Sequence, residues 1–235
     1  MNLTVATVVK DSLDDFICTL KSVELSRKSA SDCFEYLVID SSCDDAIKNL
    51  CKNYCWVKYF YVKPSGIFNA MNNAACFSDT EYIYYLNAGD ELNEKFCDDV
   101  RQHLDKSYDV IYANLGISMY VEHPLPLAFI LVGEIPFSHQ SVITKVNLVN
   151  FRKSLRNVAD MDLYLKLFIE GRCFCYIDCV FARVAPMKMS KNRVRQRYET
   201  YCVLLSRGLI FGAFCRFFLS IFNKKLFSPN RFIDH

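Results

Sequence analysis

The sequence lacks several features that would point to a function class at once. Its formal net charge is only +2 over 235 residues, which is too small to imply a nucleic-acid partner. The N-terminal "MNLTVATVVKD" has no basic region followed by an apolar core and a cleavage site, so we expect no export signal and a reducing compartment. No low-complexity linker or internal repeat interrupts the chain, which favours one catalytic domain with a tail.

The twelve cysteines include no CxxC pair. Cys51 and Cys55, like the group Cys173, Cys175 and Cys179, lack the paired spacing and nearby histidines of a zinc site. In a reducing compartment we therefore predict reduced thiols that act as small core residues.

The sequence also lacks an apolar run long enough to cross a membrane. The stretch "GLIFGAFCRFFLSIF" (208–222) is shorter than the roughly 18 apolar residues that a transmembrane helix needs, and it contains Arg216. A buried helix is one interpretation. We favour an interfacial helix, because apolar residues flanked by Arg207, Lys224 and Lys225 suit an anionic bilayer surface.

A basic stretch precedes this apolar segment. Its cations are Arg183, Lys188, Lys191, Arg193, Arg195, Arg197 and Arg207, against Glu199. Together the two stretches predict a basic and apolar helical segment over residues 183–235 that associates with a membrane.

The first 115 residues alternate between strand and helix patterns. Continuous apolar or β-branched runs predict buried strands, and segments with helical spacing of apolar residues lie between them. The predicted strands are 3–9, 35–40, 57–62 and 81–86. This alternation predicts an α/β, Rossmann-like, mostly parallel sheet with helices on both faces.

Polar groups follow each of these strands. In a parallel sheet the carboxyl ends of the strands form the ligand-binding edge. We therefore expect four groups to crowd one edge: Lys10 and Asp11, 40–45, 64–66, and 87–90.

A further helix is predicted at "NVADMDLYLKLFIEG", which ends at Gly171. Asp160 and Asp162 lie in its first turn, where a carboxylate either caps the helix or is available for chemistry. The preceding residues 116–150 are less regular and contain "SHQ", whose His139 is either a packed residue or part of a substrate site.

Five motifs in order, "VIDSSCDD", "SGIFNAMNNA", "YIYYLNAGDEL", "SHQ" and "ADMDL", resemble the family 2 glycosyltransferases of the GT-A fold. The resemblance spans residues 3–170. It is closest to bacterial members that build exopolysaccharide, colanic acid and O-antigen units. It implies a GT-A domain over 1–182, with a nucleotide-sugar-binding half (1–115) and an acceptor and catalytic half (116–182).

The resemblance also implies an activity and its setting. The expected enzyme inverts the anomeric carbon as it moves a sugar from a nucleotide sugar, expected to be a UDP-sugar, to a saccharide on undecaprenyl pyrophosphate. The expected pathway is O-antigen, capsule or exopolysaccharide synthesis. The expected place is cytoplasmic, peripheral on the inner face of the cytoplasmic membrane.

The resemblance assigns a role to each candidate residue. Asp90 is the expected ligand of Mn²⁺ or Mg²⁺, a hard cation that prefers oxygen, and Asp160 is the expected general base. The expected nucleotide-sugar-binding residues are Thr7, Val8, Val9, Asp40, Gly66, Asn69, Asn72, Asn87 and His139. Asn69 and Pro64 depart from the family, which often has aspartate at both positions.

Other interpretations stay open at this point. Asp90 and Asp40 could each cap a helix. A nucleotidyltransferase would also place carboxylates and a metal beside a nucleotide, but "TVVKDSLDD" lacks the glycine-rich triphosphate loop of that class. A non-catalytic, membrane-recruited scaffold with a degenerate site is the third hypothesis.

Overall fold

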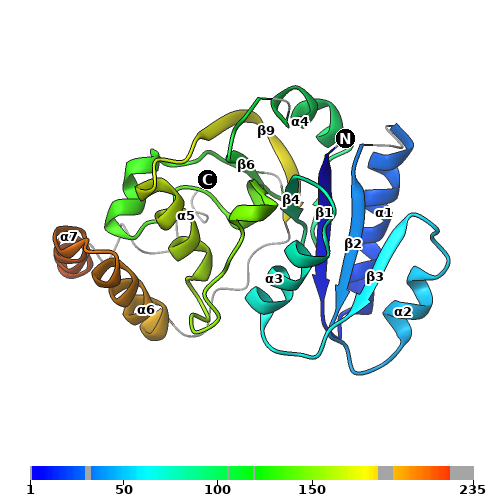
Figure 1. Cartoon of the computed structure of the whole chain (residues 1–235), viewed down its shortest axis with the longest axis horizontal. Helices are drawn as coiled ribbons and strands as arrows, with labels where there is room; N and C mark the ends of the chain where they lie inside the picture. Colours follow the sequence, from blue (N-terminus) through cyan, green and yellow to red (C-terminus); the bar gives the residue numbers. More distant parts are fainter. Residues whose placement is uncertain (1, 30–32, 105, 119, 185–192, 223–235) are drawn as a thin grey trace.

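The computed structural model describes residues 2–29, 33–104, 106–118, 120–184 and 193–222. Its nine strands form one sheet of order β3-β2-β1-β4-β8-β6-β9-β5, with β7 paired to β6 (Figure 1). The strands are β1 (Leu3–Val9), β2 (Glu35–Asp40), β3 (Val57–Tyr61), β4 (Tyr82–Tyr85), β5 (Glu91–Leu92), β6 (Val110–Ile117), β7 (Tyr120–Glu122), β8 (Val142–Lys145) and β9 (Phe174–Val184).

Seven α-helices and three short 3₁₀ helices are found in the described part of the chain. The helices are α1 (Leu13–Ser29), α2 (Ala46–Cys51), α3 (Ile67–Phe77), α4 (Phe96–Leu104), α5 (Ala159–Ile169), α6 (Arg193–Ser206), α7 (Ile210–Phe222), η1 (Leu127–Val132), η2 (His139–Ser141) and η3 (Val146–Leu148).

The predicted strand and helix alternation is confirmed for β1 to β4. These four strands are parallel neighbours in the order β3-β2-β1-β4. Every residue of β1 is buried, as expected of a strand covered on both faces. Their carboxyl ends therefore share one edge of the sheet, as the sequence predicted.

The remainder of the sheet corrects the expectation of a mostly parallel arrangement. β8 lies between β4 and β6 and is antiparallel to both. Across the whole sheet, four strand pairings are parallel and four are antiparallel. Residues 116–150, where the sequence pattern is weak, return the chain into the middle of the sheet as β8, and β5 adds a further antiparallel pair with β9.

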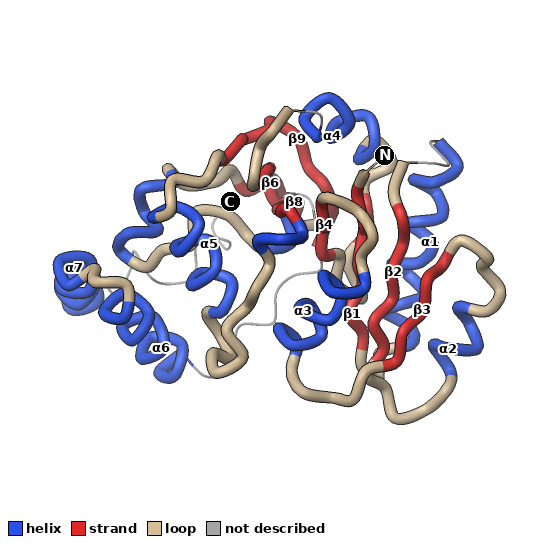
Figure 2. The backbone as a smooth tube through the Cα atoms, in the orientation of Figure 1, coloured by secondary structure: helices blue, strands red, loops and turns tan. Residues whose placement is uncertain are grey.

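Helices cover both faces of the sheet, as predicted (Figure 2). One apolar cluster joins the sheet to α1, α2 and α4, and the other joins it to α3 and α5. β1 contributes to both clusters, because successive side chains of a strand point to opposite faces. Val9 packs in the cluster with α1, α2 and α4, and Val8 packs in the cluster with α3 and α5.

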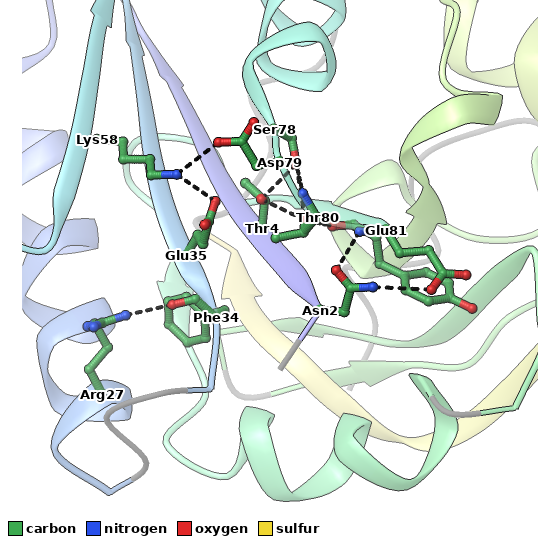
Figure 3. Close-up of polar contacts among 11 residues, drawn as sticks. Asn2, Thr4, Arg27, Phe34, Glu35, Lys58, Ser78, Asp79, Thr80 and Glu81 are labelled. Carbon is green, nitrogen blue, oxygen red and sulfur yellow. Dashed lines mark hydrogen bonds and ion pairs between the residues drawn. The ribbon is translucent and has the colours of Figure 1, made fainter.

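The amino-terminal edge of the sheet carries polar contacts that hold adjacent strands together (Figure 3). Lys58 Nζ lies 3.1 Å from Glu35 Oε2 and 3.2 Å from Asp79 Oδ2. Thr4 Oγ1 lies 2.8 Å from Thr80 Oγ1. Ion pairs this exposed contribute about 1 kcal/mol or less, so this edge has a modest structural role.

The cysteines correct a second expectation. Cys33, just before β2, and Cys97 of α4 form a disulfide, so the prediction that every thiol is reduced is wrong for this pair. No spacing signal identifies two cysteines that are 64 residues apart. Of the ten free cysteines only Cys51 is buried, so the core role predicted for them holds at one position.

The two C-terminal helices pack against the domain rather than extending away from it. Glu199 of α6 is buried and accepts from Arg195 Nε at 2.8 Å and from the Asn157 backbone N–H at 2.8 Å. Although burial opposes ionisation, these donors hold the pKa of the Glu199 carboxyl below its usual value. Val203 and Leu204 are fully buried in the core.

Helix α7 has one packed face and one exposed apolar face. Arg216 Nη1 donates to the Gly133 carbonyl at 2.6 Å and to Glu134 Oε1 at 2.9 Å. The exposed face consists of Ile210, Phe211, Phe214 and Phe217. None of the helices in the described ranges has the length and apolarity to cross a membrane. Lys188, Lys191, Lys224 and Lys225 lie outside these ranges.

Candidate active site

The loops that follow β1 and β2 are tied to each other. The Asp11 backbone N–H donates to Ser42 Oγ at 2.8 Å, and Asp11 Oδ1 accepts from the Cys43 backbone N–H at 2.9 Å. Asp11 has φ of 53°, a left-handed conformation that aspartate tolerates better than most residues. These bonds fix the shape of the edge where a nucleotide is expected.

Asp40, the predicted base-recognition residue, is fully buried at the end of β2. Its Oδ1 accepts from the Ser42 backbone N–H at 2.8 Å and its Oδ2 from the Tyr59 hydroxyl at 2.9 Å. Burial and this bond raise the pKa of Tyr59, so the hydroxyl remains a donor. Helix α2 begins after Asp45, so Asp40 is not a helix cap.

Helix α1 holds the loop that follows β4. Gly89 has φ of 97°, a conformation that glycine adopts without strain. Thr19 Oγ1 accepts from the Gly89 backbone N–H at 2.9 Å and donates to the Asp90 carbonyl at 2.8 Å. Because this hydroxyl serves both groups, α1 sets the position of Asp90.

Thr19→Val should destabilise the fold by about 1–2 kcal/mol, because the buried Asp90 carbonyl loses its donor, whereas the Gly89 backbone N–H keeps the Asp15 carbonyl as an acceptor at 3.2 Å. Thr19→Ser keeps the hydroxyl and should cost less than half as much. Urea unfolding followed by circular dichroism measures both. Equal losses in the two variants would show that packing of the methyl group matters, and that the hydroxyl does not hold the loop.

The motif "SHQ" contacts the predicted metal ligand through its glutamine. Asp90 is 4% exposed, and its Oδ2 accepts from Gln140 Nε2 at 2.5 Å. The Tyr84 hydroxyl donates to the Gln140 carbonyl at 2.7 Å, and burial raises the pKa of Tyr84 so that it stays a donor. A strand, β5, follows Asp90, so the helix-cap interpretation of Asp90 is wrong.

The histidine of the same motif connects the β4 loop to α5. His139 Nε2 lies 3.3 Å from Asn87 Nδ2, and His139 Nδ1 lies 3.6 Å from Asp160 Oδ2. Asp160 is in the first turn of α5, which begins at Ala159 after Val158, so it is not the N-cap. The structure thus brings together three residues that the sequence predicted for one site.

The second acid of the α5 motif, Asp162, makes structural ion pairs. Asp162 is 3% exposed. Its Oδ1 accepts from Arg152 Nη2 at 2.8 Å and from Arg207 Nη2 at 2.9 Å. Through these bonds Asp162 ties the start of α5 to the preceding loop and to the end of α6.

The remaining residues predicted to bind the nucleotide sugar differ in the contacts that their side chains make. Gly66 has φ of 101° and precedes α3, and no heavy atom lies within 4 Å of where its Cβ would be. Asn69 Nδ2 donates to Ser65 Oγ. Asn72 bonds the Phe151 backbone twice, at 2.8 and 2.9 Å, which gives its amide a structural use.

Thr7, Val8 and Val9 lie at the end of β1, as predicted. Thr7 Oγ1 lies 2.8 Å from the Tyr36 hydroxyl, and all three side chains are 9% exposed or less. Contact with a ligand at this strand end would therefore come from the backbone, and the three assignments stay predictions.

Asn87 and Asp90, in the loop after β4, offer oxygen ligands that suit a hard divalent cation. Asn87 Oδ1 is buried and has no hydrogen-bond partner among the described residues, and Asp90 supplies a carboxylate. Both are oxygen donors of the kind that Mg²⁺ and Mn²⁺ take. Within the described ranges no cluster of three or more His, Cys, Asp or Glu side chains could hold a metal.

Sequence comparison assigns the family. A model of the family described as "Glycosyl transferase family 2" matches residues 9–149, which is more than half of the chain. The chain belongs to glycosyl transferase family 2. No curated protein was found to be similar in sequence.

Solved structures show the same fold. S. aureus TarS 1-349 matches with a TM-score of 0.69 and 16% identity, over 89% of this chain and 66% of that one. The mannosyltransferase PcManGT from Pyrobaculum calidifontis, in complex with GDP-Man and Mn²⁺, matches with a TM-score of 0.64 and 13% identity, over 88% and 64%. At these identities the likeness shows the GT-A-like α/β fold alone, and this chain spans less than two thirds of the length of each of these proteins.

Sequence reasoning missed several residues that build this site. Gln140 lies in a motif that was noticed, but nothing in the sequence identified Asp90 as its partner. Thr19 had a weak signal, because it is a hydroxyl on the buried stripe of α1 between Phe16 and Val23. The Asp11 and Ser42 contact joins two loops and has no sequence signature.

Proposed function

We propose that this glycosyltransferase moves a sugar, with inversion, from a UDP-sugar to a lipid-linked saccharide in bacterial surface-polysaccharide synthesis. The observation that carries the proposal is the pair of contacts made by "SHQ". Gln140 bonds Asp90, the candidate metal ligand, and His139 lies beside Asp160, the candidate base. A donor site and an acceptor-activating carboxylate are thereby held next to each other.

The donor half of the proposal rests on the carboxyl edge of β1, β2 and β4. A TarS 1-349 structure was solved in complex with UDP-GlcNAc, which supports a UDP-sugar on the same fold. Asp90 and Asn87 Oδ1 would hold Mn²⁺ or Mg²⁺, which would neutralise charge on the leaving pyrophosphate. Because the chain supplies few ligands, we expect the metal and the nucleotide to bind together.

The catalytic half places one proton transfer at Asp160. As the acceptor oxygen attacks the anomeric carbon, its proton passes to the Asp160 carboxylate. The new carbon–oxygen bond forms on the face opposite the bond that breaks, and the nucleoside diphosphate leaves with that electron pair. No covalent bond to the protein is needed.

Calorimetry with a panel of UDP- and GDP-sugars, with and without Mn²⁺, tests this function. We expect at least one UDP-sugar to bind, with an affinity about tenfold or more higher when Mn²⁺ is present. Asp98→Asn, which changes an exposed carboxylate on α4, should leave both affinities unchanged. Absence of binding to every nucleotide sugar would favour the non-catalytic scaffold. Family membership favours a glycosyltransferase over a nucleotidyltransferase.

The C-terminal helices support the proposed acceptor and location. The exposed apolar face of α7 and the exposed Arg193 and Arg197 of α6 suit an anionic bilayer surface. Figure 1 shows both helices at the end of the molecule opposite β3. We propose cytoplasmic, peripheral attachment to the inner face of the cytoplasmic membrane, where undecaprenyl pyrophosphate saccharides would be reached.

The double variant Phe211→Ser/Phe214→Ser should weaken binding to vesicles that contain anionic lipid by about tenfold or more, since each ring would be withdrawn from the bilayer surface. The two side chains are 78% and 58% exposed, and circular dichroism of the double variant checks that the fold is retained. Leu25→Ser, which changes an exposed leucine on α1, is the matched control. Unchanged vesicle co-sedimentation of the double variant would remove α7 from the membrane contact.

A further inference from the structure

His139 was expected to contact the nucleotide sugar, but its surroundings indicate a different task. Its ring lies between two side chains from different elements, Asn87 after β4 and Asp160 in α5. Nε2 is 3.3 Å from Asn87 Nδ2, and Nδ1 is 3.6 Å from Asp160 Oδ2. Both ring nitrogens therefore face protein groups.

The Asn87 amide determines which ring nitrogen carries the proton. An amide NH₂ can only donate, so Nε2 must be the acceptor and the proton of the neutral ring lies on Nδ1. This N–H then points at the Asp160 carboxylate. The opposite amide orientation would place the proton on Nε2 and a lone pair of Nδ1 against Asp160, which is repulsive.

Asp160 is oriented from both of its oxygens. Oδ1 accepts from the Met161 backbone N–H at 2.8 Å, and Oδ2 faces His139. At 3.6 Å the latter contact is slightly longer than a hydrogen bond, and a small rotation of either side chain would close it.

We infer that His139 is a positioning residue, which holds Asp160 through the Nδ1–H tautomer that Asn87 selects. This inference rests on the proposed function of Asp160 as the base. Asn87 thereby serves both halves of the site, because its Oδ1 has no protein partner in the described ranges while its Nδ2 faces the ring. A change at the donor side would be transmitted to the base through one imidazole.

The tautomer can be observed directly by two-bond ¹H–¹⁵N correlation of the imidazoles at about pH 8, where most histidines are neutral. The chain has four histidines, so His139→Gln assigns the signal. We expect the Nδ1–H pattern for His139. An Nε2–H pattern in the wild-type protein would overturn the inference.

Two isosteric variants supply the kinetic arm. His139→Asn keeps a donor near the place of Nδ1, whereas His139→Gln keeps one near the place of Nε2 and leaves Asp160 unsupported. We expect kcat to fall about 10²-fold in His139→Gln, to fall less in His139→Asn, and KM for the donor to change less than about twofold in either. Equal kcat in the two variants with a raised donor KM would overturn the inference and restore the substrate-contact role.

The two arms separate this inference from the proposed function. If the protein shows the Nδ1–H pattern but transfers no sugar, the missing transfer would contradict the proposed function. It would also contradict the positioning role, since there would be no base to position. An Nε2–H pattern in an active enzyme would contradict only the role of His139.

Discussion

Asp160→Asn should lower the rate of sugar transfer by about 10²–10⁴-fold, the usual contribution of a positioned general base. The amide keeps the size of the side chain and its acceptor for the Met161 backbone N–H, but it cannot take a proton from the acceptor hydroxyl. Binding of the nucleotide should change by less than about twofold. Steady-state release of nucleoside diphosphate and calorimetric binding measure the two quantities.

The control for this prediction is Asp98→Asn, which makes the same chemical change on an exposed surface of α4. It should retain wild-type turnover. Comparable turnover of Asp160→Asn and Asp98→Asn would remove Asp160 from the chemistry and return it to a first-turn acid stabilised by the helix dipole.

Asp162→Ala should destabilise the fold by about 2–4 kcal/mol, because it leaves Arg152 and Arg207 without their shared carboxylate. The Asp162 side chain is 5% exposed, whereas the side chains of Arg152 and Arg207 are 39% and 24% exposed. We place the cost below that of a fully buried pair since both arginines keep contact with water. Urea unfolding should show a lower midpoint with an unchanged slope.

Glu170→Gln is the matched control for Asp162→Ala, because it changes an acid at the other end of α5. Within the described part of the chain, Glu170 pairs with two partly exposed cations, Lys166 and Arg172, so this substitution should cost about 0.5 kcal/mol or less. Similar losses in the two variants would show that Asp162 does not anchor α6 through Arg207.

The parallel half of the fold could be predicted because its signals are local. β1, β2 and β4 are mainly apolar or β-branched, whereas β3 contains Lys58 and is only partly buried. Each of the four strands is followed by polar residues that the common strand direction brings to one edge. β8 could not be predicted, because its four residues carry no distinctive pattern and its position depends on the path of residues 116–150. Through β8 this segment places an antiparallel strand in the middle of the sheet.

The site shows the same limit. Motif order identified Asn87, Asp90, His139 and Asp160 as neighbours. In the structure His139 lies beside Asn87 and Asp160, and the adjacent Gln140 bonds Asp90. Motif order could not identify the groups that orient these residues, such as Thr19, since a hydrogen bond between distant segments leaves no periodicity in the sequence. The same reason hid the disulfide between Cys33 and Cys97.

The central claim is that the loop after β4 holds the metal that accompanies the leaving pyrophosphate. The most direct measurement is release of nucleoside diphosphate from a UDP-sugar with Mn²⁺ and a lipid-pyrophosphate saccharide, in the wild-type protein and in Asp90→Ala. We predict acceptor-stimulated release in the wild type and a loss of about 10²-fold or more in the variant. Full turnover of Asp90→Ala would contradict the account.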